Sequence, residues 1–245
     1  LLKKYFKTTC HYPVKKNLYI TKDHKRLLYN DFLFNQSKFK LKYIHKDTEQ
    51  QYIELIFPSY KYSDDRWYII LFINELLTGY NGSILNKSLR EDRGLVYSIY
   101  TWREALKDMG SFRVSFSTQG DILECLQLIF KELNKLKHTV HSELMEDVRC
   151  NLLENIRNDI DRYSELGVMY SSDLYHLNNI PTIDSKIKKY KQITIKDINE
   201  IAKEIFVISK CSLCYSSKKN SNKSIYKLMR SLQDNTHKQI KTIKK

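Results

Sequence analysis

The stretch that decides the fold is Asn74-Glu-Leu-Leu-Thr-Gly-Tyr-Asn-Gly-Ser-Ile-Leu-Asn-Lys-Ser-Leu-Arg-Glu-Asp-Arg-Gly-Leu-Val-Tyr97. Its apolar spacing and glycines predict a helix end, a turn, a second short helix, a tight turn at Gly94 and a strand start. Arg90 and Tyr97 lie seven residues apart across the turn at Gly94. This placement can aim a guanidinium and a phenol at one point, and both groups donate hydrogen bonds to a carbonyl or carboxylate. On the residues alone, a surface ion pair for Arg90 and a core position for Tyr97 is the simpler interpretation.

Strands and helices alternate on both sides of this stretch. Period-two patterns predict strands over residues 39–43, 52–57 (stopped by Pro58), 96–100, 111–117 and 206–215. Helical spacing and capping residues predict helices over residues 64–78, 83–93, 123–136, 142–178 (broken near Gly167) and 194–205, which opens with a Thr194–Asp197 capping box. Because the strands come in pairs that are adjacent in sequence, the order predicts an α+β sandwich with a largely antiparallel sheet packed against helices.

The net charge is carried by the two ends of the chain. Of 245 residues, 42 are Lys or Arg and 28 are Asp or Glu, which gives +14. Residues 1–30 hold eight basic residues and one acid, and residues 218–245 hold nine and one, so residues 31–217 keep 25 and 26. Nucleic-acid-binding proteins usually present a basic face on the fold itself, so this distribution argues against nucleic acid as a partner. We expect the basic ends to be solvated tails, or weak anchors for an anionic partner or membrane surface.

Cysteines and histidines form no recognisable metal motif. Five cysteines at scattered positions give no disulfide framework, which favours a reducing intracellular compartment such as the cytoplasm or an organelle matrix. Cys211 and Cys214 lie in a predicted strand, where residues three apart face opposite sides and cannot share one zinc ion. His138 and His141 fall at the break between two predicted helices, with Ser142 as the N-cap of the second. Neither HExxH nor HxxEH occurs, so we expect no metal ligand and no catalytic residue here.

The composition also bounds the class of protein. A hydrophobic fraction of 42% with 12% aromatic residues is typical of a globular domain. No stretch approaches the roughly 18 apolar residues that a transmembrane helix needs. We therefore expect a soluble protein without a transmembrane segment.

Residues 74–100, NELLTGYNGSILNKSLREDRGLVYSIY, resemble a block of the M16 (pitrilysin and mitochondrial processing peptidase-like) zinc metallopeptidase family, in its second homologous domain. The likeness extends to four further segments, Thr48-Glu-Gln-Gln51, Met109-Gly-Ser-Phe-Arg-Val114, Ser142-Glu-Leu144 and Ile193-Thr-Ile-Lys-Asp-Ile-Asn199, and covers roughly residues 45–217. Two features depart from the family pattern: its Gly-Gly pair is replaced by Gly79-Tyr80-Asn81-Gly82, and residues after 217 have no counterpart.

The resemblance implies a division of labour between two halves. In this family the zinc site, HxxEH with a distal Glu, lies in the first homologous domain. The second domain supplies an Arg and a Tyr, seven residues apart, that bind the backbone of the substrate. Arg90 and Tyr97 match that pair, so the resemblance implies the C-terminal, substrate-clamping half of a zinc metalloendopeptidase. Zinc and the HxxEH-bearing domain would belong to the same polypeptide or to a separate subunit, the substrate would be a peptide, and this chain alone would not be catalytic.

Two questions stay open from the sequence. The same fold also serves as a catalytically inactive scaffold or partner subunit in this family, and nothing in this chain separates the two roles. Leu-Leu-Lys-Lys-Tyr-Phe at residues 1–6 resembles the end of the helix that closes the first domain. We therefore expect residues 1–44 to be the end of a preceding domain and a linker, 45–217 the C-terminal-type domain, and 218–245 a basic tail.

Overall fold

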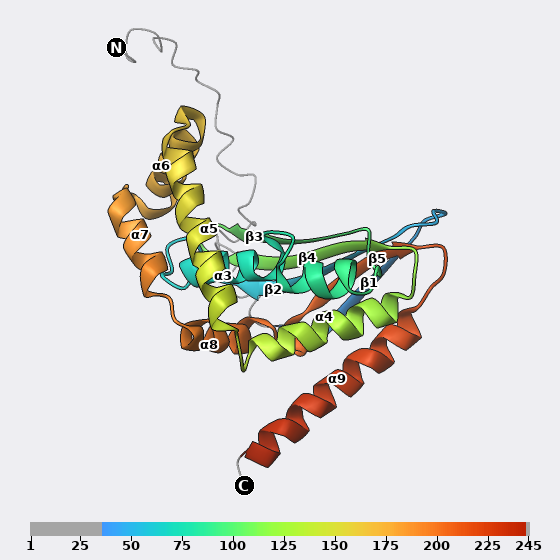
Figure 1. Cartoon of the computed structure of the whole chain (residues 1–245). Helices are drawn as coiled ribbons and strands as arrows, with labels where there is room; N and C mark the ends of the chain where they lie inside the picture. Colours follow the sequence, from blue (N-terminus) through green and yellow to red (C-terminus); the bar gives the residue numbers. More distant parts are fainter. Residues whose placement is uncertain (1–35, 244–245) are drawn as a thin grey trace, which may run out of the picture.

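A computed structural model describes residues 36–243 and shows a five-stranded sheet with helices gathered on one of its faces (Figure 1). The opposite face of the sheet carries none of the described helices. This arrangement confirms the α+β sandwich expected from the sequence. The helix end expected at residues 1–9 and the connector at 10–35 lie outside the described residues.

The sheet is largely antiparallel, as predicted. Its strands are β1 (Lys40–His45), β2 (Gln51–Ser59), β3 (Ser98–Ala105), β4 (Gly110–Thr118) and β5 (Ser212–Ser217). They lie in the order β1-β5-β2-β4-β3, and only the β1–β5 pair is parallel. Of the described strands, the last in sequence is therefore inserted between the first two, which joins the two ends of the described domain.

The helices lie between β2 and β3, between β4 and β5, and after β5. They are α3 (Trp67–Thr78), α4 (Ile122–Leu136), α5 (Ser142–Ile160), α6 (Tyr163–Leu177), α7 (Ile183–Gln192), α8 (Ile195–Ile205) and α9 (Asn222–Ile243), with a π-helical turn η1 (Asn86–Glu91) and a 3₁₀ turn η2 (Ile208–Lys210). The predicted capping box is present at the start of α8, where Thr194 and Asp197 exchange side-chain to backbone hydrogen bonds.

Alternate residues of β2 and β4 form the sheet side of the core. Leu55 pairs with Val114 and Phe57 with Phe112, and all four side chains are fully buried. The Phe57 ring meets the Phe206 ring edge-on, with the centroids 5.3 Å apart. Removing a buried aromatic side chain of this kind costs about 3–5 kcal/mol. The helix-facing side of the sheet is thus fixed by close contact.

Strand β2 is longer than predicted because it continues through Pro58 to Ser59. Pairing with β5 ends at Ile56, whereas pairing with β4 continues to Ser59. Pro58 therefore lies where β2 has no neighbouring strand on its β5 side. On that side no hydrogen bond between strands is lost through the missing N–H of proline.

The helical break predicted near Gly167 is wrong in position. The chain leaves helical geometry at Arg162, whose backbone is extended, and Gly167 lies inside α6. His141, rather than Ser142, is the N-cap residue of α5. Helix α7 was not predicted, and β5 begins at Ser212 rather than at residue 206 because η2 precedes it.

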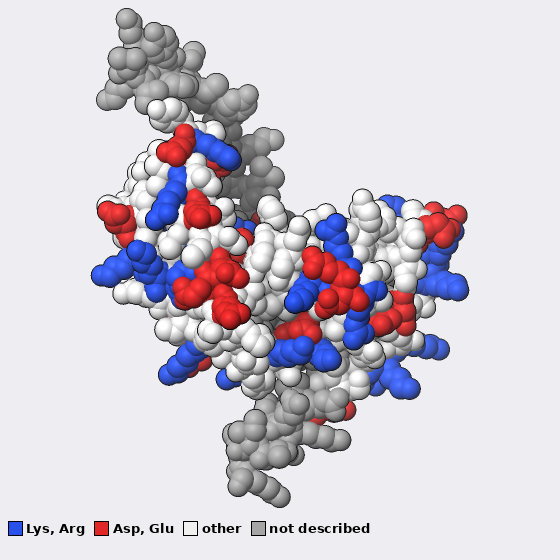
Figure 2. Space-filling view, viewed as in Figure 1, with Lys and Arg blue, Asp and Glu red and all other residues white. Residues whose placement is uncertain are grey.

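The segment expected to be a solvated tail contributes to the core instead. Ile225 and Met229 of α9 are buried, and the helix contacts α4. β1 likewise begins before the expected domain boundary at residue 45. Over the surface seen in Figure 2, Lys and Arg are interspersed with Asp and Glu, in keeping with the neutral composition of residues 31–217.

Candidate functional site

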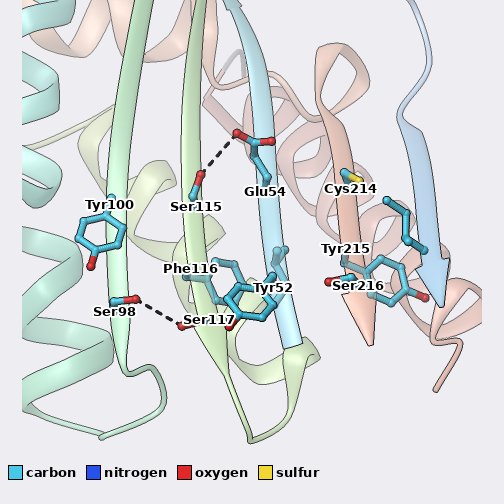
Figure 3. Close-up of a pocket in the computed structure, with 12 residues that line it drawn as sticks. Tyr52, Glu54, Ser98, Tyr100, Ser115, Phe116, Ser117, Cys214, Tyr215 and Ser216 are labelled. Atoms are coloured by element: carbon cyan, nitrogen blue, oxygen red, sulfur yellow. Dashed lines mark hydrogen bonds between the residues drawn. The ribbon is translucent and has the colours of Figure 1, made fainter. Parts of the chain in front are cut away.

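A depression of about 430 Å³ lies on the face of the sheet that carries no described helix (Figure 3). All five strands of the sheet contribute to it, β1 through Ile44. Ser98, Ser115 and Ser117 form a floor of small side chains, while Tyr52 and Tyr100 are 48% and 63% exposed at its sides. It is therefore a shallow, polar-floored hollow between two aromatic rings.

The register of the strands brings these side chains together. Tyr100 pairs with Ser115, and Ser115 pairs with Glu54. In the next row on the same face, Ser98 and Tyr52 lie on either side of Ser117. Because side chains alternate between the two faces of a strand, the core residues between them point to the helices.

Polar contacts hold the floor in place. The Ser98 and Ser117 hydroxyl oxygens lie 3.3 Å apart, and Gln50 Nε2 donates to Ser117 Oγ at 2.9 Å. Ser115 Oγ lies 3.5 Å from Glu54 Oε1, a long contact. Glu54 Oε1 also lies 3.8 Å from an Arg113 nitrogen, so this carboxylate keeps acceptor capacity for a further donor.

The structure places Arg90 and Tyr97 on the two sides of a tight turn beside the depression. Arg90 lies near the end of η1, and Tyr97 directly precedes Ser98 of β3. Arg90 is exposed and Tyr97 is 82% exposed. Among the described residues, neither side chain has a hydrogen bond or an ion pair. The structure therefore supports neither the surface ion pair nor the core aromatic that the residues alone suggested.

The outward position of Tyr97 follows from an interruption in the strand pattern. Val96 and Ile99 are both buried, so Tyr97 and Ser98 between them both lie away from the core. This is why β3 begins at Ser98 rather than at Val96, as the sequence had suggested.

The turn itself is firmly held. Gly94 has a φ of +58°, and its N–H donates to the Arg90 carbonyl at 3.1 Å. Leu89 is fully buried and its carbonyl accepts the Leu95 N–H at 2.8 Å. The Thr118 hydroxyl donates to the Leu95 carbonyl at 2.6 Å. These hydrogen bonds fix the backbone from which the two exposed side chains extend.

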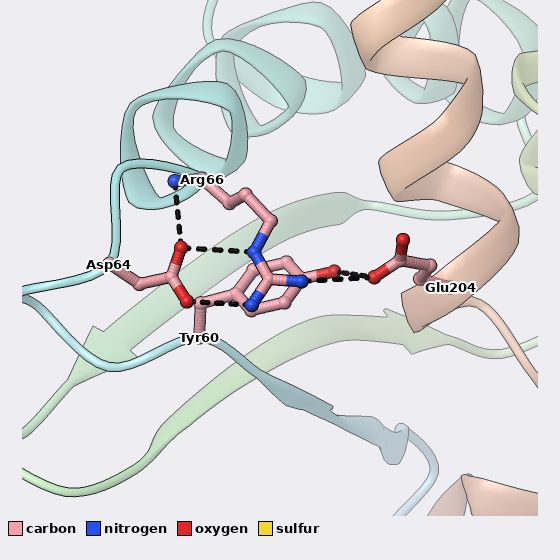
Figure 4. A network of polar contacts seen from close by, with 4 residues as sticks. All are labelled: Tyr60, Asp64, Arg66 and Glu204. Carbon is pink, nitrogen blue, oxygen red and sulfur yellow. Dashed lines mark hydrogen bonds and ion pairs between the residues drawn. The ribbon is translucent and has the colours of Figure 1, made fainter.

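A second polar cluster lies away from the depression and has a structural role (Figure 4). The Arg66 guanidinium donates to both Asp64 oxygens at 2.9 and 2.7 Å and lies 3.9 Å from the centroid of the Tyr60 ring. Tyr60 and Arg66 both donate to Glu204 of α8. The hydrogen bond from Arg66 lowers the pKa of Asp64. These contacts join the start of α3 to the end of α8, and the Asp64 carboxylate also accepts the Arg66 N–H.

The described residues do not fit a zinc ion. No three His, Cys, Asp or Glu side chains gather among residues 36–234 in a way that could hold a metal. Cys211 is buried, which raises the pKa of its thiol, whereas Cys214 lines the depression on the opposite face. This confirms that the two cysteines face opposite sides.

The depression was not identified from the sequence. Its side chains occupy the outward positions of strands that the alternation did predict, and that pattern is the available signal. The sequence does not reveal the register of the strands, and it is the pairing of β2 with β4 that brings Glu54 and Ser115 together.

A sequence profile of the peptidase M16 inactive domain matches residues 23–152. An uncharacterized zinc protease of Bacillus subtilis is 24% identical over 163 residues, which is 66% of this chain and 40% of that protein. A similarly described protein of Streptomyces coelicolor is 33% identical over 172 residues, with 68% and 37% covered. A solved protease structure from Helicobacter pylori has a TM-score of 0.69 at 16% identity, over 74% of this chain and 45% of that one.

Each of these matches covers less than half of the length of the related protein. The chain spans 28–40% of the length of the curated relatives it matches, and 45% of the solved protease. At 16% identity the solved structure shows a common fold. None of the described helices is both long enough and apolar enough to cross a membrane.

Proposed function

The chain belongs to the family of the peptidase M16 inactive domain, and we propose that it is the substrate-clamping half of a zinc endopeptidase whose other half carries HxxEH. The observation that carries the proposal is the pair of exposed donors at the Gly94 turn. Arg90 and Tyr97 have no partner among the described residues, so binding a ligand breaks no internal hydrogen bond. The hydrogen-bonded backbone of the turn fixes the points from which the two side chains leave the chain, so the backbone needs little reorganisation when a ligand binds.

The chemistry of the pair suits a peptide backbone. Arg90 offers a planar fork of N–H donors and Tyr97 a single O–H donor, and peptide carbonyl oxygens accept from both. Tyr97 adjoins Ser98, which lines the depression, so an extended peptide held at the turn continues onto the open face of the sheet. Hydrolysis itself belongs to the other half, where we expect the zinc ion to be held.

Peptide binding by this chain tests the proposal. A fluorescein-labelled unstructured peptide would be titrated with the wild-type chain and with Arg90→Ala and Tyr97→Phe, and its anisotropy followed. Loss of one hydrogen bond to a charged or phenolic donor costs roughly 1–1.5 kcal/mol, so each variant should bind about tenfold more weakly.

Arg93→Ala is the matched control, because Arg93 lies in the same turn but is paired with Glu124 at 3.7 Å. It should bind the peptide as the wild type does. Equal affinity for all the variants would contradict a clamping role. It would favour the alternative of an inactive scaffold or partner subunit.

A further inference from the structure

We propose that the depression on the open sheet face is a specificity pocket for a basic side chain of the bound peptide, with Glu54 as its counter-ion. The proposal rests on the proposed clamping function and adds to it a preference that neither Arg90 nor Tyr97 can impose. Both of those side chains donate to the backbone, which every peptide carries, and so they do not distinguish one sequence from another.

The charge of the lining is the first argument. Among the described residues that line the depression, Glu54 is the one with a charged side chain, and the rest are aromatic, aliphatic, serine or cysteine. Figure 3 shows the Glu54 carboxylate directed toward Ser115 of the neighbouring strand.

The nearest cation contacts the Glu54 carboxylate only at a long distance. Arg113 makes its short contact with Glu104, at 2.7 Å, and reaches Glu54 only at 3.8 Å. The three side chains together carry one net negative charge. Lys42, which the register places in the row of Glu54 beyond Cys214, makes no ion pair with it. A ligand cation would therefore find an acceptor with room for a further hydrogen bond.

The aromatic walls are the second argument. Tyr52 and Tyr100 stand on either side of the serine floor, and strand spacing puts the backbones of Tyr100 and Glu54 about 10 Å apart. The floor between the two tyrosines lies low because its side chains are those of serines, which are short. Aromatic faces attract Lys and Arg. In this chain Lys46 Nζ already lies 5.6 Å from the centroid of the Tyr52 ring.

The test uses peptides that differ in one side chain. A single lysine would be moved along an otherwise uncharged labelled peptide, and the best position then repeated with norleucine and with glutamate. The wild-type chain should prefer lysine over norleucine by roughly fivefold to thirtyfold and bind the glutamate peptide most weakly. Trp102, the next residue of β3 on the same face and 61% exposed, provides an independent fluorescence signal of occupancy.

Variants then assign the preference to the pocket. Glu54→Gln should abolish the preference for lysine over norleucine, and Glu54→Lys should reverse it in favour of glutamate. Tyr100→Ala should weaken binding of the lysine peptide more than that of the norleucine peptide. Glu49→Gln is the matched control and should keep the wild-type preference, because Glu49 is an exposed acid that pairs with Lys218 and does not line the depression.

The possible failures are distinguishable. If the peptides bind and Arg90→Ala weakens them, but lysine, norleucine and glutamate bind equally, the pocket is wrong and the clamp stands. If a lysine preference exists but survives in Glu54→Gln, the basic side chain binds elsewhere and the inference is likewise overturned. If no peptide binds the folded chain, the clamping function fails, and with it the pocket. Circular dichroism of each variant shows whether it has folded.

Discussion

Gly94 is the residue on which the presentation of the two donors depends. Its φ of +58° lies in the left-handed region, which residues with a Cβ rarely adopt. A Cβ built at this position meets nothing within 4 Å, so the demand for glycine comes from the backbone and not from crowding. The buried residues Leu89 and Val96 fix the chain on either side. Between these anchors, a left-handed turn leaves Arg90 and Tyr97 facing solvent.

We therefore expect two glycine-to-alanine substitutions to act in opposite directions. Gly94→Ala should lower the free energy of unfolding by about 1–2 kcal/mol, because alanine is strained in the left-handed region. Gly167, in the middle of α6, also has open space around a built Cβ but has helical geometry. Gly167→Ala should raise the free energy of unfolding by about 0.5–1 kcal/mol. Urea denaturation measures both, and two changes of the same sign would refute the interpretation of Gly94.

At the scale of elements, a buried ion pair connects α6 and α7 to the rest of the domain. Asp173 of α6 is 1% exposed, and its oxygens contact Lys186 Nζ of α7 at 2.5 Å and the Tyr62 hydroxyl at 2.9 Å. Tyr62 precedes α3, and its ring stacks on His176 at 4.6 Å. A buried charge needs its partner, so these contacts define how the two helices sit against α3 and α5.

Removing one partner of this pair should be costly. Asp173→Ala leaves Lys186 buried without its counter-ion, and we expect a loss of about 3–5 kcal/mol in the free energy of unfolding. The double variant Asp173→Leu with Lys186→Met should be clearly more stable than the single variant, because no buried charge is left unpaired. Asp184→Ala, an exposed acid on α7, is the control and should change little. Equal stability of the single and double variants in urea denaturation would argue against the ion pair.

The same helices show where prediction from the sequence stops. Strands β2 and β4 and helices α4 and α8 were predicted because their alternation, amphipathic spacing or capping box is local to each segment. Helix α7 was missed because its buried residues include Lys186, which reads as a solvated position until Asp173 is known to face it. The helical break was predicted at Gly167 on residue type alone, whereas helical geometry is interrupted at Arg162.

At the scale of the whole molecule, the helices occupy one face of the sheet and the candidate site the other. Strand β5 pairs with β1, as in Lys40 with Ser212, and with β2, as in Tyr52 with Ser216. The sheet therefore combines residues from both ends of the domain. Such long-range pairing carries no local signal, so the depression and Glu54 could not be predicted. Arg90 and Tyr97 could be singled out because they lie within one continuous stretch. Their exposure and lack of partners required the structure.

The division of labour between two halves is the central claim, and hydrolysis by an assembly of this chain with an HxxEH-bearing M16 half tests it most directly. The measurement is kcat/KM for a fluorogenic peptide, with the assembly verified by size-exclusion chromatography for each variant. The account predicts that Arg90→Ala combined with Tyr97→Phe lowers kcat/KM by roughly a hundredfold, while Arg93→Ala leaves it unchanged. An intact assembly that cleaves the peptide equally well without both donors would contradict it.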